Sequence, residues 1–187
     1  DSLQGSKVFS SLDLKSGYWQ IKLRPSDKEK TAFITHMGLF QFTKTAFGLC
    51  NAPSAFQTLM QAVLGDAQYN HCLAYLDDVV IHSKTLKEHL VHLQDVFKRL
   101  EKAGLKLKPS KCQYICPNLA FLGHVISAEG VQVAPEKVRA ITEMPEPTTP
   151  TLVRGFVGLC SFYRKFIPNM AEISKPLTQL TKKDVKF

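Results

Sequence analysis

The spacing of hydrophobic residues predicts strands in the first part of the chain. Residues 7–23 begin and end with strand patterns, and residues 19–23 alternate apolar with polar positions. Residues 31–43 alternate again on either side of residues 36–38, a short stretch that contains a glycine. These patterns predict extended segments at both ends of residues 7–23 and a β-hairpin after them.

A helical pattern follows the glycine-bearing turn at residues 47–54. Asn51 is a residue type that caps helices, and Pro53 suits a first helical turn. Apolar residues then recur at helical spacing until Gly65, which favours the end of the helix. The apolar positions of this predicted helix are Phe56, Leu59, Met60, Val63 and Leu64.

The clearest helical pattern lies between Leu86 and Leu100, where apolar residues repeat by fours and threes. Thr85 and Glu88 form the sequence pattern of a capping box, and Gly104 marks the end of the pattern. The opposite face carries charged residues. We therefore expect an amphipathic helix with one face in the core.

Prolines are concentrated after residue 144. Residues 144–150 hold three prolines in seven positions, which predicts a stiff connector between helices. Beyond it, apolar residues recur at helical spacing up to Phe166, and residues 167–169 interrupt the pattern before a last short helix. Together with the strands and helices before it, this order predicts an α+β fold, in which two helices back a sheet, with a small helical appendage.

The composition is typical of a folded domain with a basic surface. The 187 residues suffice for one large or two small domains, and 44% of them are hydrophobic and 21% charged. No apolar run is long enough to cross a bilayer, and the first residues show no signal-peptide pattern, so neither membrane insertion nor secretion is expected. The net charge of +8 favours a polyanionic partner such as nucleic acid. The alternative is that the basic surface only keeps the protein soluble.

The cysteines and histidines give weaker signals. The five cysteines are scattered, and Cys72 lies in an apolar run, as a reduced core residue would. Cys112 and Cys116, with the next histidine beyond them, have a spacing that zinc sites allow, but the second ligand pair of such a site is missing. His89 and His92 lie one helical turn apart, and we interpret them as solvated residues on a helix face.

Two adjacent carboxylates interrupt the apolar residues 70–83. Asp77 and Asp78 separate two apolar runs, without the Asn-Gly or Asp-Gly pair that would explain a simple hairpin turn. Two anions between buried strands repel each other and lose hydration, so we expect a divalent cation against them. The alternative is a hydrated turn that binds nothing. Asp13 interrupts another apolar strand. If the two strands are neighbours in one sheet, the same explanation accounts for all three acids.

Five longer motifs occur in order along the chain. They are SLDLKSGYWQI (residues 11–21), FGLCNAPSAFQ (47–57), YLDD (75–78), GLKLKPSKC (104–112) and FLGHVI (121–126). In order and approximate spacing they resemble reverse transcriptases, and most closely the polymerases of gypsy-like long-terminal-repeat retrotransposons. The tail FVGLCSFYRKFIPNMAEISKPL is similar to the thumb segment of the same enzymes, so the resemblance extends over essentially the whole chain.

The resemblance implies the fold of a right-hand polymerase. Residues 1–128 would form the palm, an antiparallel sheet backed by helices, and residues 22–50 would form a part of the fingers. Residues 129–187 would form a small helical thumb. Ala46 and Trp19 depart from the proline and histidine that many relatives have there. The first fingers segment and the ribonuclease H domain of the family have no counterpart in the sequence, so we expect an excised core.

The resemblance also implies catalytic and metal-binding residues. In this family, acids at the positions of Asp13 and Asp77 hold two Mg²⁺ ions, with Asp78 beside them and Leu14 among the metal-binding positions. Mn²⁺ is an alternative ion. Oxygen ligands suit these hard cations, and a pair of metal ions supports phosphoryl transfer. Lys111 resembles the lysine near the triphosphate, a proton donor to pyrophosphate, and a solvated surface lysine is the alternative.

Further positions are implied for nucleotide and primer binding. Tyr18 matches the aromatic residue that blocks a ribose 2′-hydroxyl, and a buried core tyrosine is the alternative. Phe47 and Gly48 match the turn under the incoming nucleotide. The positions implied for primer and template contact are Tyr75, Leu76 and the primer-grip residues Phe121, Leu122 and Gly123. For the primer grip the alternative is a plain apolar strand.

The implied activity is RNA-directed DNA polymerisation by a fragment of a retroelement polyprotein. Its partners would be an RNA or DNA template with a DNA primer, and deoxynucleoside triphosphates. The expected location is intracellular: the cytoplasm, a retroelement particle or the nucleus. The alternative function is a non-catalytic nucleic-acid-binding module that descends from such a polymerase and holds phosphates with its basic surface.

Overall fold

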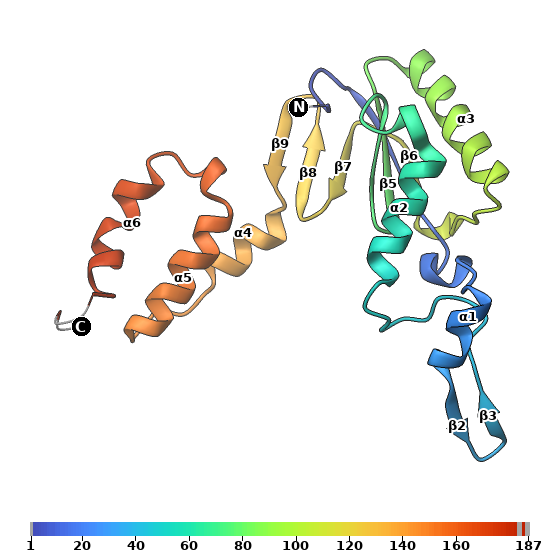
Figure 1. The fold of residues 1–187 in the computed structure, drawn as a ribbon. Coiled ribbons are helices and arrows are strands. Elements are labelled where there is room, and N and C mark those ends of the chain that lie inside the picture. Colours follow the sequence, from blue (N-terminus) through green and yellow to red (C-terminus); the bar gives the residue numbers. More distant parts are fainter. Residues whose placement is uncertain (1, 183–184, 186–187) are drawn as a thin grey trace. The chain divides into compact units, whose positions relative to one another are not determined.

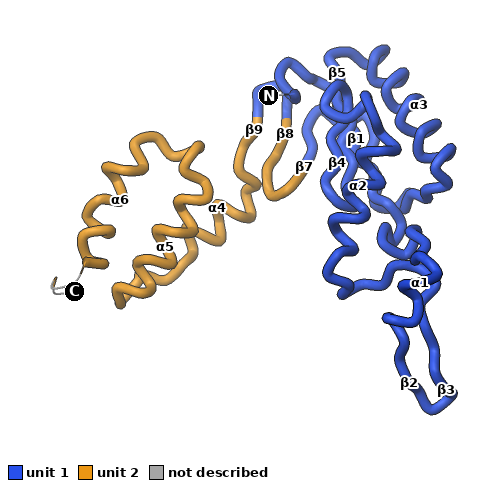
Figure 2. Tube along the Cα trace, viewed as in Figure 1, with its two compact units in different colours: residues 1–119, 127–130 blue, residues 120–126, 131–187 orange. Residues whose placement is uncertain are grey.

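The computed structural model describes residues 2–182 and residue 185 (Figure 1). The chain divides into two compact units, which are residues 1–119 with 127–130 and residues 120–126 with 131–187 (Figure 2). A three-stranded sheet has the order β7 (Asn118–Phe121), β8 (His124–Ser127) and β9 (Gly130–Val133). The predicted boundary after residue 128 falls inside this sheet.

A four-stranded sheet organises the first unit. Its strands lie in the order β4 (Cys72–Tyr75), β5 (Asp78–Ser83), β1 (Val8–Asp13) and β6 (Gln113–Cys116). All neighbours are antiparallel, and β1 with β5 forms a continuous ladder in which Val8 is opposite Ser83 and Asp13 is opposite Asp78. The two apolar strands that the sequence predicted on either side of the acidic pair are thus β4 and β5.

Helices α2 (Ala52–Leu64) and α3 (Leu86–Lys102) complete the core of this unit. Both contribute to one buried cluster with β1, β4 and β5, as the α+β prediction required. The cluster contains Leu12, Leu14, Phe56, Met60, Leu64, Ala67, Cys72, Val79, Ile81, Leu93, Val96 and Leu100. Cys72 is therefore a buried, reduced core residue, as predicted, and burial raises the pKa of its thiol to about 12.

The predicted ends of the two helices are largely confirmed. α2 ends at Gly65, whose φ of 52° suits glycine, and Asn51 occupies the N-cap position as predicted, but its side chain makes no hydrogen bond to the helix start. α3 begins with the predicted capping box, in which Thr85 and Glu88 bond each other's backbone N–H groups. The first turn of α2 relies instead on its proline, which has no N–H to satisfy.

The strand predicted at residues 19–23 is wrong in its first part. Residues Gly17–Gln20 form a 3₁₀ turn, η1, and only the following residues are extended, with an isolated bridge between Lys22 and Lys44. Tyr18 and Ile21 are the partly buried residues that contact the core, and their spacing of three matches one 3₁₀ turn. Burial at this spacing, and not at every second residue, decides the local structure.

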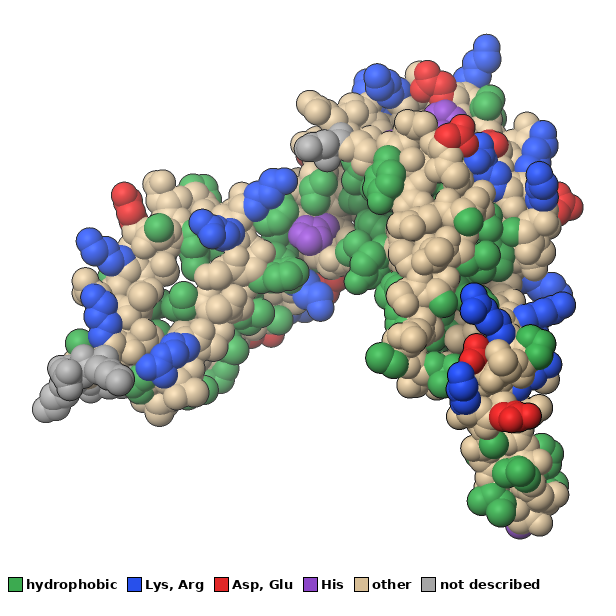
Figure 3. All heavy atoms as spheres, viewed as in Figure 1, with side chains coloured by type: hydrophobic (Ala, Val, Ile, Leu, Met, Phe, Trp, Pro, Cys, Tyr) green, Lys and Arg blue, Asp and Glu red, His purple; other side chains and the backbone are tan. Residues whose placement is uncertain are grey.

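The predicted hairpin is confirmed, and its apolar residues face solvent. β2 (Phe33–Thr35) pairs with β3 (Gly38–Phe40) after a short helix, α1 (Pro25–Lys28). Ile34 is 83% exposed, and Met37 and Leu39 are also exposed, so apolar side chains lie along the surface of this hairpin (Figure 3). A two-stranded ribbon has no interior in which to bury them.

The interpretation of His89 and His92 as solvated residues is wrong. His89 is fully buried, with hydrogen bonds to Ser10 Oγ (2.7 Å) and Ser83 Oγ (2.9 Å). His92 is half-buried and bonds Ser83 Oγ at 2.8 Å. Two strands thus supply hydroxyl partners to the helix, which offset the cost of burying the imidazoles. His82, on β5, is also buried and bonds Ser6 Oγ at 3.0 Å.

The second unit is mainly helical. It holds α4 (Pro135–Thr142), α5 (Pro150–Phe162) and α6 (Met170–Gln179). The proline-rich connector leads into α5, whose first turn is capped by Thr149, and Asn169 adopts a φ of 53° at the predicted break before α6. Among the described residues, no helix is both long enough and apolar enough to cross a membrane.

Candidate active site

The ends of β1 and β5 bring the three acids together. Asp13 is the last residue of β1 and lies opposite Asp78, the first residue of β5, and Asp77 occupies the turn just before it. The Leu14 N–H donates to the Asp77 carbonyl oxygen (3.2 Å), which fixes the two chain segments to each other beyond the ladder. The structure confirms that the acid at position 13 lies beside the acidic pair. The role of these acids stays a prediction.

Each acid of this cluster disfavours the ionisation of its neighbours. Burial raises the pKa of Asp77, and the carboxylates of Asp13 and Asp78 raise it further. Burial and Asp13 likewise raise the pKa of Asp78. Lys111 partly balances this charge, because its Nζ lies 3.4 Å from Asp13 Oδ2. The cluster is therefore one in which added positive charge is stabilising.

Gly17 makes room for Asp77. A Cβ built on Gly17 would overlap Asp77 Oδ1 and would lie 2.8 Å from Phe56 Cζ. Asp77 Oδ1 is also buried and has no hydrogen-bond partner within residues 2–182 and 185. A buried carboxylate oxygen without a partner is costly, so this atom needs a donor or a cation that the protein itself does not supply.

The turn that carries Asp77 is held by a residue that the sequence reasoning missed. Leu76 has a φ of 53°, which is unusual for a residue with a branched side chain. Gln57 of α2 holds the turn, because its Oε1 accepts from the Leu76 N–H (3.0 Å) and its Nε2 donates to the Ala74 carbonyl oxygen (3.2 Å). Its position at the end of the motif FGLCNAPSAFQ was the available signal.

A cavity of about 290 Å³ opens beside the acids. Its lining residues are Asp13, Leu14, Lys15, Ser16, Phe47, Asp77, Lys108 and Lys111. Backbone bonds hold the lysine-bearing segments in place: the Lys108 N–H donates to the Asp13 carbonyl oxygen at 2.9 Å. Two carboxylates and three lysines in one cavity suit a ligand with cations and phosphates together. Lys15 and Lys108 were not predicted as site residues.

Two of the three predicted nucleotide-binding residues are solvent-exposed, and Phe47 lines this cavity. Phe47 is exposed, while Gly48 follows it with a φ of 89°. Tyr18 does not line the cavity: it is half-buried, with edge contacts to Phe47 (5.2 Å between ring centroids) and Phe56 (5.8 Å). These contacts favour the core-tyrosine alternative, and its predicted contact with a nucleotide stays a prediction.

The predicted primer-contact residues lie at two turns. Tyr75 is exposed at the end of β4, next to Leu76. In the second unit, Phe121 ends β7, and Leu122 (φ 50°) and Gly123 (φ 77°) form the tight turn into β8. Positive φ at both central residues is the geometry of a type I′ hairpin turn. The alternative of a plain apolar strand is therefore wrong for Leu122 and Gly123.

The three acids have oxygen atoms that suit a metal ion, but their side chains do not lie close enough together to act as its ligands. Carboxylate oxygens are ligands for Mg²⁺, and the partnerless Asp77 Oδ1 is one of them. Across the described part of the chain, however, no group of three or more His, Cys, Asp or Glu side chains is placed closely enough to hold a metal ion. A bound cation would have to draw the three carboxylates closer together.

Comparisons by sequence and by structure both find known proteins that resemble this chain. The family model described as "Reverse transcriptase (RNA-dependent DNA polymerase)" matches residues 1–126. The Pol polyprotein from transposon 297 of Drosophila melanogaster is 43% identical over 181 residues, which are 97% of this chain and 17% of that protein. The Tf2-3 transposon polyprotein of Schizosaccharomyces pombe is 36% identical over 185 residues, 99% of this chain and 14% of that protein.

Solved structures show the same likeness. A foamy viral protease-reverse transcriptase in complex with double-stranded DNA has a TM-score of 0.83 and 30% identity, covering 93% of this chain and 30% of that one. A foamy viral protease-reverse transcriptase with an RNA/DNA hybrid has a TM-score of 0.76 and 29% identity, covering 96% of this chain and 24% of that one. The chain thus spans less than a fifth of the two polyproteins and less than a third of these structures.

Proposed function

Because the chain belongs to the reverse transcriptase family and has its palm-like α+β fold, we propose that it is the core of an RNA-directed DNA polymerase. It would add deoxynucleotides to a primer 3′-hydroxyl on an RNA or DNA template. The observation that carries the proposal is the meeting of Asp13, Asp77 and Asp78 beside a lysine-lined cavity. The chain is a small part of its relatives, so the polymerase would act within a longer protein.

Reverse transcriptases generally use divalent metal ions, and the acids of this chain are suited to hold them. Two Mg²⁺ ions, or Mn²⁺ in their place, would be held by Asp13, Asp77 and Asp78, with Leu14 at the same strand end. When bound, such ions activate the attacking hydroxyl and offset the charge that develops on the phosphate. Asp77 Oδ1 and the raised pKa values of Asp77 and Asp78 support this proposal, because each reflects negative charge without a sufficient partner.

The lysines of the cavity would hold the phosphates of the nucleotide. Lys15, Lys108 and Lys111 line the same cavity as the acids, and each offers an ammonium group that can donate to phosphate oxygens. Lys111 would also protonate the departing pyrophosphate, as a general acid near the reaction centre can. Phe47, exposed at the rim of the cavity, would lie under the incoming base or sugar, with Tyr18 fixing its position through their edge contact.

Nucleic acid is the proposed partner of the basic surface. The foamy viral relatives were solved with double-stranded DNA and with an RNA/DNA hybrid, and this chain carries a net charge of +8. The exposed turns at Tyr75–Leu76 and at Phe121–Gly123 would contact the primer strand. Both turns carry an exposed large side chain, Tyr75 or Leu122, next to backbone that is fixed by a hydrogen bond, at the Leu76 N–H in one turn and at the Gly123 carbonyl oxygen in the other.

The test is primer extension by the polymerase region that contains this chain, on an RNA template with Mg²⁺. Asp77→Asn should reduce extension by several orders of magnitude, because it removes a charge needed only when the metal ions and the reacting phosphate are bound. The matched control is Glu101→Gln on the exposed face of α3, which should extend as the unchanged protein does. Equal product from Asp77→Asn and the control would show that the catalytic assignment is wrong.

A further inference from the structure

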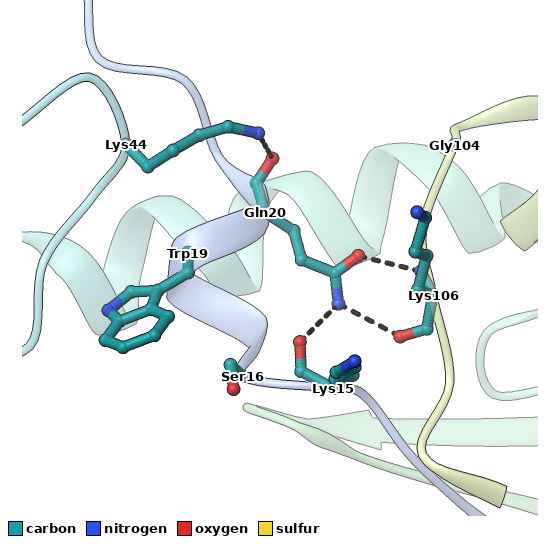
Figure 4. A pocket seen from close by; sticks show the side chains of 7 residues that line it. All are labelled: Lys15, Ser16, Trp19, Gln20, Lys44, Gly104 and Lys106. Carbon is teal, nitrogen blue, oxygen red and sulfur yellow. Dashed lines mark hydrogen bonds between the residues drawn. The ribbon is translucent and has the colours of Figure 1, made fainter.

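A second cavity of about 370 Å³ lies next to the first one in the same unit. The two share Lys15 and Ser16, and the second is completed by Trp19, Gln20, Lys44, Gly104 and Lys106 (Figure 4). Its size is within the range of small-molecule sites. None of the residues that line it is acidic, which distinguishes it from the cavity that contains Asp13 and Asp77.

Gln20 makes the wall of this cavity rigid. Its Nε2 donates to the carbonyl oxygens of Lys15 (2.8 Å) and Lys106 (3.0 Å), and its Oε1 accepts from the Lys106 N–H (2.7 Å). Figure 4 shows this amide between the two backbone segments. The Lys15 N–H also donates to the Lys106 carbonyl oxygen at 2.9 Å. Three of these four hydrogen bonds join segments that are far apart in sequence, so the cavity is a defined part of the fold.

Trp19 gives the cavity an aromatic surface. Its side chain is 55% exposed, although most of its ring is apolar. It contacts Phe47 edge-on, with ring centroids 5.9 Å apart and an interplanar angle of 64°. A flat aromatic ligand that stacked on the indole would remove apolar surface from water without displacing a core residue.

Three lysines give the cavity a positive charge without a partner. Within the described residues, Lys15, Lys44 and Lys106 form no ion pair with an acidic side chain. Lys44 Nζ has only a long contact, 3.5 Å, to the Gln20 carbonyl oxygen. The Lys106 and Lys15 side chains are exposed. Their ammonium groups are thus available to phosphate oxygens.

We propose that this second cavity binds a nucleotide unit, with its base stacked on Trp19 and its phosphates held by Lys44 and Lys106. The ligand is either a free nucleoside triphosphate or an unpaired nucleotide of a single-stranded nucleic acid, since both present a base next to phosphate. The inference goes beyond polymerisation, because the cavity contains none of the three acids that carry the proposed chemistry.

Trp19 itself provides the readout, since it is the only tryptophan in the chain. Stacking of a base on the indole should quench its fluorescence. The full chain is titrated, without Mg²⁺, with ATP, with an oligothymidylate and with inorganic tripolyphosphate. Quenching by ATP identifies a free-nucleotide site, tighter quenching by the oligonucleotide identifies a single-strand site, and tripolyphosphate should compete with either without quenching by itself.

Two lysine variants decide whether the cavity is responsible. Lys44→Ala and Lys106→Ala retain the tryptophan, and each should weaken binding about tenfold, the effect of losing roughly 1.4 kcal/mol. Lys98→Ala, on the exposed face of α3, is the matched control and should bind as the unchanged chain does. Fluorescence that does not respond to ATP or to the oligonucleotide overturns the proposal, as does equal binding by the three variants.

A variant that removes the ring tests stacking by a second method. Trp19→Ala should bind ATP or the oligonucleotide about tenfold more weakly in a calorimetric titration, given the usual contribution of base stacking. Its melting temperature is compared with that of the unchanged chain to show that it is folded. These titrations use neither Mg²⁺ nor primer extension, so failure of nucleotide binding here and failure of the proposed catalysis are separate results.

Discussion

The Oδ1 atom of Asp77 lies in the space that a Cβ at position 17 would fill. Gly17→Ala should therefore displace the Asp77 carboxylate or the nearby Phe56 ring. We expect a loss of about 1–3 kcal/mol in the free energy of unfolding, as is typical of overpacking. We also expect a smaller rise in melting temperature on addition of Mg²⁺. Urea unfolding and thermal melts with and without Mg²⁺ measure both effects.

Another glycine provides the control for this substitution. Gly158 lies in α5, and nothing is within 4 Å of a Cβ built there. Gly158→Ala should leave the protein equally stable or more stable, because alanine favours a helix by roughly 1 kcal/mol over glycine. An equal loss of stability in the two variants would show that the contact between residues 17 and 77 has no special importance.

The charge of the acidic cluster should reduce stability near neutral pH. Since the pKa values of Asp77 and Asp78 are raised in the folded protein, the folded state keeps protons that the unfolded state releases first, and stability falls as pH increases from the ordinary aspartate pKa through the raised pKa values of the folded state. Asp77→Asn should raise the melting temperature without Mg²⁺ and abolish the increase that Mg²⁺ produces in the unchanged chain. Thermal melts at pH 7.5 test both.

Glu101→Gln removes one negative charge from an exposed position of α3 and should retain the full Mg²⁺ effect. A Mg²⁺ response that persists in Asp77→Asn would mean that the ion binds elsewhere.

The buried histidines should make the fold sensitive to acid. Burial lowers the pKa of His82 to about 4, and burial also lowers the pKa of His89. Their folded pKa values lie below the unfolded value near 6.5, so the unfolded state takes up protons first and stability falls as pH decreases from about 6.5 to about 4. His82 alone accounts for about 3 kcal/mol of this loss, the equivalent of its shift in pKa.

His82→Gln should reduce the pH dependence between pH 6.5 and pH 4.5, measured as the difference in urea unfolding free energy at the two values. Glutamine retains a hydrogen-bonding side chain but does not titrate in this range. His36, exposed at the β2–β3 turn, provides the comparison, and His36→Gln should leave the pH dependence unchanged. The assignment fails if both variants show the same dependence as the unchanged chain.

Gln57 should be needed for the turn that carries Asp77. Gln57→Ala removes the partners of the Leu76 N–H and the Ala74 carbonyl oxygen, and we expect a loss of about 1–3 kcal/mol in unfolding free energy. Primer extension should fall as well, because the position of Asp77 depends on this turn. Gln61→Ala, an exposed position on the same helix, should affect neither measurement.

The arrangement of the acids could be predicted because it follows from strand patterns. Apolar runs on both sides of Asp77 and Asp78 indicated a hairpin, and the apolar residues before Asp13 indicated the strand beside it. The family motifs supplied the fact that these strands are neighbours. The strand patterns and the resemblance to the family were therefore together sufficient to predict the sheet and the acidic cluster.

Other features depend on contacts between distant residues, which local patterns do not contain. His89 is buried because Ser10 and Ser83, on two different strands, provide its hydrogen-bond partners. The turn at residues 17–20 forms because Tyr18 and Ile21 both contact the core, and a spacing of three cannot be distinguished from irregular alternation in so short a segment. Gln57 likewise bonds the Leu76 N–H only because the fold places α2 beside the turn, so local sequence does not predict this role.

The β2–β3 hairpin has a practical consequence for work with the isolated chain. With Ile34, Met37 and Leu39 in contact with water, we expect concentrated samples to self-associate through this ribbon. Threonine or lysine at these three positions would give a reagent suited to crystallisation and spectroscopy, since none of them lines either cavity.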